Sequence, residues 1–474
     1  MLLAIGIAVR LVHVRQPMRH DEAYTFLHYA SAPLSSALSD YTYPNNHLFH
    51  TLLVWLTTRV IGGSPEAIRV PAFVAGTLLL PAVYLLARRF ADRGAALVAL
   101  GLAAAWPALV LYSTNARGYS IVVLVFAGLL LLGERAIDEA ARWTWLWIGV
   151  LLFVGTYTAP VMLYPGGAAL LWMPVEAWRR HGWRGARRVL ARAAATGTLA
   201  GLAAALAYLP AVRRSGLEAV VANRYVTPLP LRDLVGALPA FAGDLVVSLG
   251  LGIPLPALAL LGFAGAVGLF APGPDRARRA TLAATVLGWC ALLLLLTRRP
   301  PPSRVWLFLV PIACVYAGAG LSAGARWLAR GADPGGARSS ATLAISLALV
   351  MSGWALVTRA VFRSPETGTL VDAPEIAGYL LARLGPGDRV VVASPCDVPL
   401  DYYLRRQGRR SLSGINRSAA RGRVFVVVDP RHLQTLGGVQ AGARDIPWSA
   451  LRPDAEPAGF PQASVHGFRF VAQP

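Results

Sequence analysis

Two adjacent carboxylates, Asp21 and Glu22, stand directly after the first apolar stretch of the chain, in the segment RHDEAYTFLHYA. Ionisable groups at membrane depth are expensive, so they mark functional sites by default. A carboxylate held there is suited to general base catalysis, because it can take a proton from an attacking group in the transition state. The structural alternative is that Asp21 only caps the helix that begins at this point, as aspartate often does.

A second polar segment, YTYPNNHLFH, follows in the same predicted loop and contains Asn46, His47 and His50. The two histidines are three residues apart and would share one face of a helix. Together with Asp21 and Glu22, His47 suggests a site for a divalent metal ion such as Zn, Mn or Mg. The spacing matches no recognised zinc motif, so histidines that hydrogen-bond the loop at the membrane surface are the competing interpretation.

Arginines and tyrosines form the third group of candidates. The segment LYSTNARGYS contains Tyr112, Arg117 and Tyr119, and the segment RRPPPSR contains Arg298, Arg299 and Arg304. Guanidinium groups bind carboxylates and phosphates through charge-assisted hydrogen bonds. Arg117 could therefore pair with either group, and the arginines of RRPPPSR are candidates to hold the phosphate of a bound lipid. The alternative for the tyrosines is an ordinary aromatic belt at the membrane interface. The alternative for the arginines of RRPPPSR is nonspecific contact with lipid headgroups.

Composition predicts the class of protein that carries these residues. The chain of 474 residues is 55% hydrophobic and 15% charged, and several apolar runs approach the roughly 20 residues of a membrane-spanning helix. We therefore expect a polytopic α-helical membrane protein. Its net charge of +21 does not indicate nucleic acid, because the arginines lie mostly in short loops between apolar runs. The three cysteines form neither a disulfide framework nor a CxxC motif.

The hydropathy pattern predicts about 11 to 13 transmembrane helices. The first lies within residues 1–14, and we expect its start to be truncated. The others are predicted at 69–87, 94–112, 119–133, 143–160, 161–178, 189–210, 251–271, 280–297, 303–323 and 340–361. The segment 47–63 is ambiguous, because it either crosses the membrane or lies at its outer surface as an interfacial or re-entrant helix.

Charge decides the predicted orientation. With 47–63 left out of the count, 17 arginines between positions 87 and 340 lie on one side of the membrane and 8 on the other. The positive-inside rule assigns the first side to the cytoplasm. Five parts of the chain are then expected outside: the candidate residues between 15 and 68, the loop 112–119, the segments 211–250 and 298–304, and the C-terminal tail.

The composition changes near residue 362. The sequence predicts a helix begun by Pro374, a Gly/Pro turn, a buried strand, a second helix and another buried strand at RVFVVVD. We therefore expect a transmembrane catalytic domain at 1–361, with the site in its first external loop at 15–68, and a small soluble α/β domain at 362–474. The second domain lacks a GxGxxG motif, so nucleotide binding by it is not supported.

Several of these motifs occur together in one known family. The early Asp-Glu pair, the NNH element, GGSPEAIRVPAFVAGTLLLPAVYLLARRF and YSTNARGYS resemble the C-type (GT-C) membrane glycosyltransferases. The most similar branch contains the protein mannosyltransferases and the aminoarabinose transferase of lipid A. The tail segment GDRVVVASPCDVPLDYYLRRQG resembles the external domain of the bacterial members. The chain departs from the pattern in two places, with NNHLF where prolines commonly follow the histidine and STNAR where SREAR is common.

The resemblance implies a multi-pass enzyme of the bacterial inner or plasma membrane. Such an enzyme takes a sugar from a polyprenyl-phosphate donor, inverts the anomeric centre and passes the sugar to a glycan, lipid or protein acceptor on the extracytoplasmic face. Asp21 would be the catalytic base and Glu22 its acidic neighbour. The residues expected to bind substrate are Asn46, His47, Tyr112, Arg117, Tyr119, Arg298, Arg299 and Arg304. A polysaccharide polymerase or ligase and a flippase of lipid-linked sugars are the alternatives.

Overall fold

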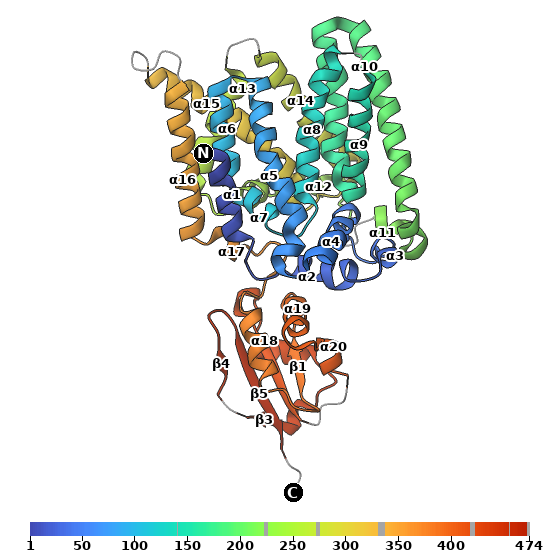
Figure 1. The fold of residues 1–474 in the computed structure, drawn as a ribbon, viewed down its shortest axis with the longest axis vertical. Coiled ribbons are helices and arrows are strands. Elements are labelled where there is room, and N and C mark those ends of the chain that lie inside the picture. The colour runs from blue at the N-terminus through green and yellow to red at the C-terminus, as the bar shows by residue number, and fades with distance from the viewer. Residues whose placement is uncertain are drawn as a thin grey trace. The chain divides into compact units, whose positions relative to one another are not determined.

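The computed structural model describes residues 1–139, 141–221, 226–271, 275–329, 337–417, 422–454 and 456–471. Two of the arginines counted for the orientation, Arg224 and Arg330, lie outside these residues. The chain divides into two compact units (Figure 1). Unit 1 contains residues 1–14 and 33–364, and unit 2 contains residues 15–32 and 365–474.

Unit 1 is a bundle of helices joined by short connections. Its helices are α1 (Leu2–His13), α3 (Leu34–Ala37), α4 (Leu48–Ile61), α5 (Pro65–Phe90), α6 (Arg93–Ala105), α7 (Pro107–Ser113), α8 (Tyr119–Asp138), α9 (Arg142–Thr158), α10 (Leu163–Ser215), α11 (Leu217–Val221), α12 (Leu231–Gly250), α13 (Leu255–Phe270), α14 (Arg276–Thr297), α15 (Leu309–Leu328), α16 (Ala337–Val357) and α17 (Ala360–Arg363). A 3₁₀ segment, η3 (Ser303–Phe308), leads into α15. Helix α10 is two helices joined at a sharp kink, where Gly182 has a φ of 65°.

Among the described residues, seven helices are long and apolar enough to cross a membrane. They are α5, α8, α10, α12, α14, η3 with α15, and α16. The bent pair α6 and α7 is long and apolar enough when taken together, and is either a broken span or a re-entrant loop. Three shorter apolar helices, α1, α4 and α13, belong to the same bundle. The polytopic helical fold predicted from hydropathy is therefore confirmed. The number of single helices long enough to span a membrane is smaller than the 11 to 13 expected.

Helix α12 was not predicted, because the sequence placed it inside the external segment 211–250. Its ends nevertheless lie on the same side of the bundle. The Leu229 amide just before it donates to the carbonyl of Arg298, which follows α14, at 2.8 Å. The Trp354 indole of α16 donates to the carbonyl of Gly252, just after α12, at 2.8 Å. Because α14 and α16 both end on that side, both ends of α12 lie there. Helix α12 therefore does not change the predicted order of the membrane spans.

Helix α4 occupies the ambiguous segment 47–63. It has 14 residues, which is short of the roughly 20 needed to span a bilayer. Its length therefore agrees with the interfacial interpretation on which the predicted orientation depends.

A buried arginine fills the break between α6 and α7. The two helices meet at an angle of 59° at Trp106, and Pro107 lacks the N–H that the Ala103 carbonyl would accept in a continuous helix. Arg10 of α1 is fully buried. It donates from Nη1 to the Ala104 carbonyl at 2.9 Å and from Nη2 to the Ala103 carbonyl at 3.4 Å. Arg10 thus supplies a donor to the Ala103 carbonyl in place of the N–H that the proline lacks, and a second donor to the Ala104 carbonyl at the same break.

Substitution Arg10→Met is expected to destabilise unit 1. It leaves the carbonyls of Ala103 and Ala104 buried without these donors, and an unsatisfied buried polar group costs about 1–3 kcal/mol. We expect the thermal unfolding midpoint of the detergent-solubilised protein to fall by several degrees. Arg88→Met, at an exposed arginine, is the control and should leave the midpoint unchanged. Equal midpoints for the two variants would contradict this role of Arg10.

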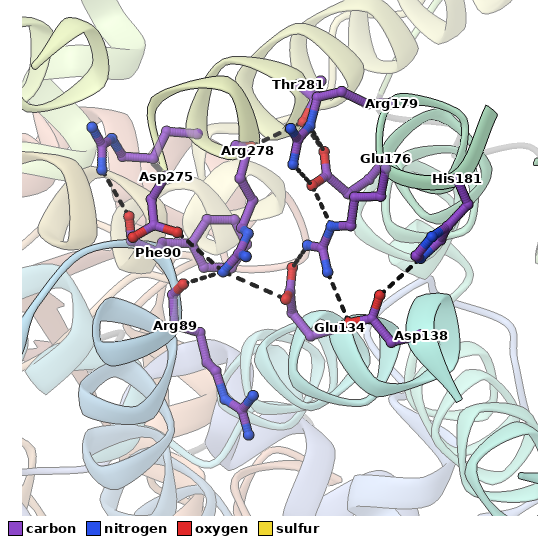
Figure 2. Close-up of polar contacts among 12 residues, drawn as sticks. Arg89, Phe90, Glu134, Asp138, Glu176, Arg179, His181, Asp275, Arg278 and Thr281 are labelled. Carbon is purple, nitrogen blue, oxygen red and sulfur yellow. Dashed lines mark hydrogen bonds and ion pairs between the residues drawn. The ribbon is translucent and has the colours of Figure 1, made fainter. Parts of the chain in front are cut away.

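A network of charged residues joins four helices at the end of the bundle where α8 finishes (Figure 2). Glu176 of α10 is fully buried and accepts from Arg179 Nε at 2.9 Å, Arg180 Nε at 2.7 Å and Thr281 Oγ1 at 2.7 Å. Arg180 also donates from Nη2 to Glu134 of α8 at 2.8 Å. Arg278 of α14 lies 3.6 Å from Glu134 and hydrogen-bonds the Arg89 carbonyl of α5. The network therefore ties α5, α8, α10 and α14 together.

Glu176→Gln is expected to lower the stability of the bundle by about 1.5–3 kcal/mol, because hydrogen bonds to a charged group are worth that much. The exposed carboxylate of Asp138 belongs to the same network, with a side chain that is 51% accessible. Asp138→Asn is therefore the matched control, and exposed ion pairs contribute about 0–1 kcal/mol. Thermal unfolding of the two variants in detergent measures the difference; an equal effect would show that burial does not set the strength of these bonds.

Unit 2 contains a mixed sheet flanked by short helices. The elements are α2 (His20–Thr25), the π-helical turn η1 (Phe26–Ala30), α18 (Ala373–Leu381), β1 (Arg389–Val392), α19 (Asp397–Gly408), α20 (Leu412–Ile415), β2 (Arg423–Val428), α21 (Leu436–Gly442), β3 (Leu451–Pro453), β4 (Ala458–Gly459) and β5 (Ser464–Phe470). The sheet order is β1-β2-β5-β3, with β1 and β2 parallel, β5 antiparallel to β2, and β4 paired with β5. The core contains Val424, Val426 and Val428 of β2 together with Val439, Ile446, Leu451 and Phe468.

The two strands and two helices expected after residue 362 are all present in unit 2. The residues that make up unit 2 differ from the expected domain at 362–474 in one main respect. Residues 15–32 were expected to belong with the transmembrane domain, because they follow its first helix. They cluster instead with residues 365–474, since α2 packs on α19 and hydrogen-bonds the segment 367–369.

Candidate functional site

Most of the predicted substrate-binding residues gather in unit 1 where α8 begins. We call this group the His47 cluster and define it as Asn45, His47, Tyr112, Arg117, Tyr119 and Arg304. His47 immediately precedes α4, Tyr112 lies in the last turn of α7, Tyr119 begins α8, and Arg304 lies in η3. Segments that are far apart in sequence thus bring two arginines, two tyrosines and a histidine together, as the predicted convergence of the loops requires.

Arg117 lies at the centre of the His47 cluster. It is 2% exposed and donates from Nη1 to the Asn45 carbonyl at 2.8 Å. Its Nη2 is 3.4 Å from His47 Nε2, and its guanidinium lies 5.8 Å from the ring centre of Tyr119. An arginine fixed by several neighbours keeps its positive charge in one place, which is what electrostatic stabilisation of a phosphate needs.

His47 is held as a neutral ring. Burial and the positive charge of Arg117 lower the pKa of His47 well below its ordinary value. Its Nδ1 accepts the backbone N–H of Gly118 at 2.8 Å, so the neutral ring carries its proton on Nε2. The 3.4 Å approach of Arg117 Nη2 to this N–H is therefore a packing contact and not a hydrogen bond. His47 therefore supports the turn that carries Arg117 and does not serve as a proton acceptor through Nδ1.

Gly118 is a residue that the sequence did not single out. A Cβ at this position would lie 2.4 Å from Thr158 Cγ2 and 2.7 Å from His47 Nδ1. The tight approach lets the Gly118 amide reach the histidine. A glycine between Arg117 and the start of an apolar helix was the available signal.

Arg304 and Tyr119 form the second half of the cluster. Arg304 Nε donates to the Tyr119 hydroxyl at 3.0 Å. The Tyr119 ring packs edge-on against His47 at 4.9 Å and against Tyr112 at 5.3 Å between ring centres. Arg304 is only partly buried, so it is the more accessible of the two cations. The tyrosines are thus bound into the cluster and are more than an aromatic belt.

Three other predicted residues lie apart from these contacts. Asn46 is fully buried and donates to the carbonyls of Ala37 and Asp40 at 2.8 and 2.7 Å, which is a role in folding the loop before α4. Arg298 is exposed and ends α14 with a φ of 53°. The Arg299 amide lies 3.4 Å from Thr297 Oγ1. For these residues, binding of substrate remains a prediction.

The carboxylate pair belongs to unit 2. Helix α2 begins at His20 with Arg19 as its N-cap, so Asp21 is not the capping residue that the structural alternative required. Asp21 is partly buried, and its amide donates to the Thr367 carbonyl at 3.2 Å. Glu22 is fully buried, and its Oε1 accepts the Arg19 amide at 2.8 Å. Glu22 thus stabilises the first turn of the helix, which leaves Asp21 as the better candidate for chemistry.

The predicted metal site is divided between the units, with Asp21 and Glu22 in unit 2 and His47 in unit 1. Among the described residues, the grouping of potential ligands that converges is a different one: Cys396, Asp429 and His432. There Arg431 occupies both oxygens of Asp429, at 3.0 and 3.1 Å. A divalent metal ion bound by Asp21, Glu22 and His47 stays a prediction.

Residues 45–209 match the family described as dolichyl-phosphate-mannose-protein mannosyltransferase. The crystal structure of ArnT from Cupriavidus metallidurans bound to undecaprenyl phosphate is similar over 98% of this chain and 97% of that one, with a TM-score of 0.62 and 15% sequence identity. The predicted resemblance is confirmed. The chain has the fold of the C-type membrane glycosyltransferases.

The same fold is found in ArnT in the apo state, which has a TM-score of 0.62, 14% identity and the same coverage of 98% and 97%. No curated protein matches the sequence. The segment matched by the glycosyltransferase family contains His47, Arg117 and Tyr119, whereas Asp21 and Arg304 lie outside it.

Proposed function

We propose that this protein is an inverting glycosyltransferase that moves a sugar from a polyprenyl-phosphate donor to an acceptor on the extracytoplasmic face of a bacterial inner or plasma membrane. The observation that carries the proposal is the His47 cluster, in which Arg117 donates to the Asn45 carbonyl and Arg304 to the Tyr119 hydroxyl, so that separate segments of the fold hold both arginines. ArnT, which has this fold, binds undecaprenyl phosphate in its crystal structure, and that supports a donor of the same chemical class here.

The reaction requires one base and a stabilised leaving group. The oxygen of the acceptor attacks the anomeric carbon while the bond from that carbon to the donor phosphate breaks. Asp21 takes the proton of the acceptor, and the bonding electrons leave with the polyprenyl phosphate. A single displacement of this kind inverts the anomeric centre. General base catalysis contributes typically about 10²–10⁴-fold.

The arginines act on the departing phosphate. Its charge increases as the bond breaks, so a guanidinium already in place stabilises the transition state more than the bound donor. In this proposal Arg117 and Arg304 provide that charge, and His47 and Tyr119 hold them in position. Arg298 and Arg299 add positive charge for the headgroup of the lipid.

The test uses isolated membranes that contain the full-length protein. Polyprenyl-phosphate sugars and nucleotide sugars are offered separately with an extract of cell-envelope acceptors, and donor consumption is measured. We expect consumption of the lipid-linked donor alone. Consumption of nucleotide sugars, or movement of the lipid-linked sugar across the membrane without transfer, would contradict the proposal and favour another transferase class or a flippase.

A further inference from the structure

We infer that unit 2 is the scaffold that fixes the helix of the proposed base, with Gly368 as a positioning residue for Asp21. This inference rests on the proposed function and deepens it. Residues 15–32 belong to unit 2 although they are joined at both ends to unit 1 in sequence. The segment that carries Asp21 is therefore folded by residues about 350 positions later in the chain.

Backbone hydrogen bonds provide the first part of the scaffold. The His20 amide donates to the Gly368 carbonyl at 3.1 Å, and the Asp21 amide donates to the Thr367 carbonyl at 3.2 Å. Arg19 and Thr369 form an antiparallel bridge. The first N–H groups of a helix have no partner within the helix, and here the segment 367–369 supplies acceptors for two of them.

Side chains provide the second part. Arg19 is 1% exposed and donates from Nη1 to the Glu366 carbonyl at 3.1 Å. The Met18 amide donates to the Tyr403 hydroxyl at 3.1 Å. His20 Nδ1 lies 3.1 Å from the Pro395 carbonyl and 3.6 Å from Asp397. The residues on the N-terminal side of Asp21 are thus held by two segments of unit 2, the turn at Glu366 and helix α19 with the residues just before it.

The turn that accepts these bonds is conformationally demanding. Thr367 and Gly368 have φ values of 69° and 67°, a region that residues with a Cβ rarely adopt and that costs most for a β-branched residue. Such outliers persist where the surroundings over-determine them, and they cluster at functional sites. A Cβ on Gly368 would lie 2.6 Å from Pro395 Cβ and 3.0 Å from His20 Cβ. A side chain at this position must therefore displace His20 or Pro395, and His20 is the neighbour of Asp21.

The test compares Gly368→Ala with Gly437→Ala in the full-length protein. Gly437 is the control, because a Cβ there meets nothing within 4 Å and its φ is not positive. A misplacement of about 1 Å can cost roughly 100-fold in rate. We expect Gly368→Ala to lower kcat about 10- to 100-fold, while the affinity and stoichiometry of polyprenyl phosphate binding stay those of the wild type. Gly437→Ala should match the wild type in both.

A double-mutant cycle separates positioning from loss of folded protein. If Gly368 acts through Asp21, Gly368→Ala has no further effect on the residual rate of Asp21→Asn, because residues that act as a unit are non-additive. A purely structural effect would reduce that residual rate by the same factor and lower the stoichiometry of binding. Tyr403→Phe is a milder second variant, which removes the acceptor of the Met18 amide and should reduce kcat several-fold with the same non-additivity.

The outcomes distinguish this inference from the proposed function. If Asp21→Asn keeps full activity, the proposed function of that residue fails. If Asp21→Asn loses activity while Gly368→Ala and Tyr403→Phe behave as Gly437→Ala, the proposed base stands and the scaffold is overturned. Additive effects in the cycle would also overturn it.

Discussion

Asp21→Asn is expected to lower the rate of sugar transfer by about 10²–10⁴-fold, the contribution of a general base. The substitution keeps the size of the side chain and leaves the amide of residue 21 available to the Thr367 carbonyl. It removes the negative charge of the side chain and with it the ability to take the proton of the acceptor. Initial rates with a saturating lipid-linked donor measure the effect, and donor binding should be unchanged, because the arginines assigned to the phosphate are intact.

The control for Asp21→Asn is Asp445→Asn in the same unit. Asp445 is 62% exposed in its side chain and forms an ion pair with Arg389 at 2.6 Å. The control removes the same charge from the protein and should leave the rate unchanged. If Asp21→Asn transfers sugar as fast as this control, Asp21 has no part in proton transfer.

Arg117→Met is expected to reduce transfer by about 10²–10³-fold, the loss observed when one preorganised donor to a developing negative charge is removed. The variant also frees the Asn45 carbonyl and the ring of His47, which Arg117 contacts at 2.8 and 3.4 Å. Arg117→Lys should recover only part of the rate, because a lysine keeps the charge without the planar fork of donors. Transfer rates and binding of polyprenyl phosphate are measured together.

The matched control for Arg117 is Arg59→Gln. Arg59 is an exposed arginine of α4 that lies 5.0 Å from the ring centre of Trp55, and its loss should affect neither rate nor binding. Thermal unfolding of Arg117→Met in detergent checks that the protein is folded. If a folded Arg117→Met variant binds polyprenyl phosphate and transfers sugar like Arg59→Gln, Arg117 has no part in the site.

The membrane helices were predictable because their signal is local. A run of about 20 apolar residues must form a helix in lipid, where backbone groups can be satisfied only within the segment. Helix α12 escaped the prediction although it is also 20 residues long. It contains Pro239, Asp233 and Asp244, which lower its hydropathy, and it returns to the side of the bundle on which it begins.

The candidate site was predictable in composition but only partly in arrangement. The sequence indicated His47, Arg117, Tyr119 and Arg304, and the structure brings these four together. Their residue types and their place at the ends of apolar segments carried that signal. The capping role of Glu22 and the folding role of Asn46 depend on individual hydrogen bonds, which residue type and spacing do not specify.

The contacts that hold the helix of Asp21 could not be predicted from the sequence. Its contacts join Arg19, His20 and Asp21 to the segment 366–369, and no periodic pattern reports a pairing between such distant segments. Gly368 carried a weak signal, because glycine is common in turns of many kinds. The positive φ values of Thr367 and Gly368 are a property of the folded chain.

The most direct test of the central claim is a single-turnover reaction of the purified full-length protein with a polyprenyl-phosphate sugar labelled at the anomeric carbon. NMR of the labelled carbon reports the configuration of the product, and chromatography reports free polyprenyl phosphate. We expect equal amounts of polyprenyl phosphate and a product of inverted configuration from the wild type, and a rate at least about 100-fold lower from Asp21→Asn. Retention of configuration, or an unchanged rate in Asp21→Asn, would contradict a single displacement with Asp21 as its base.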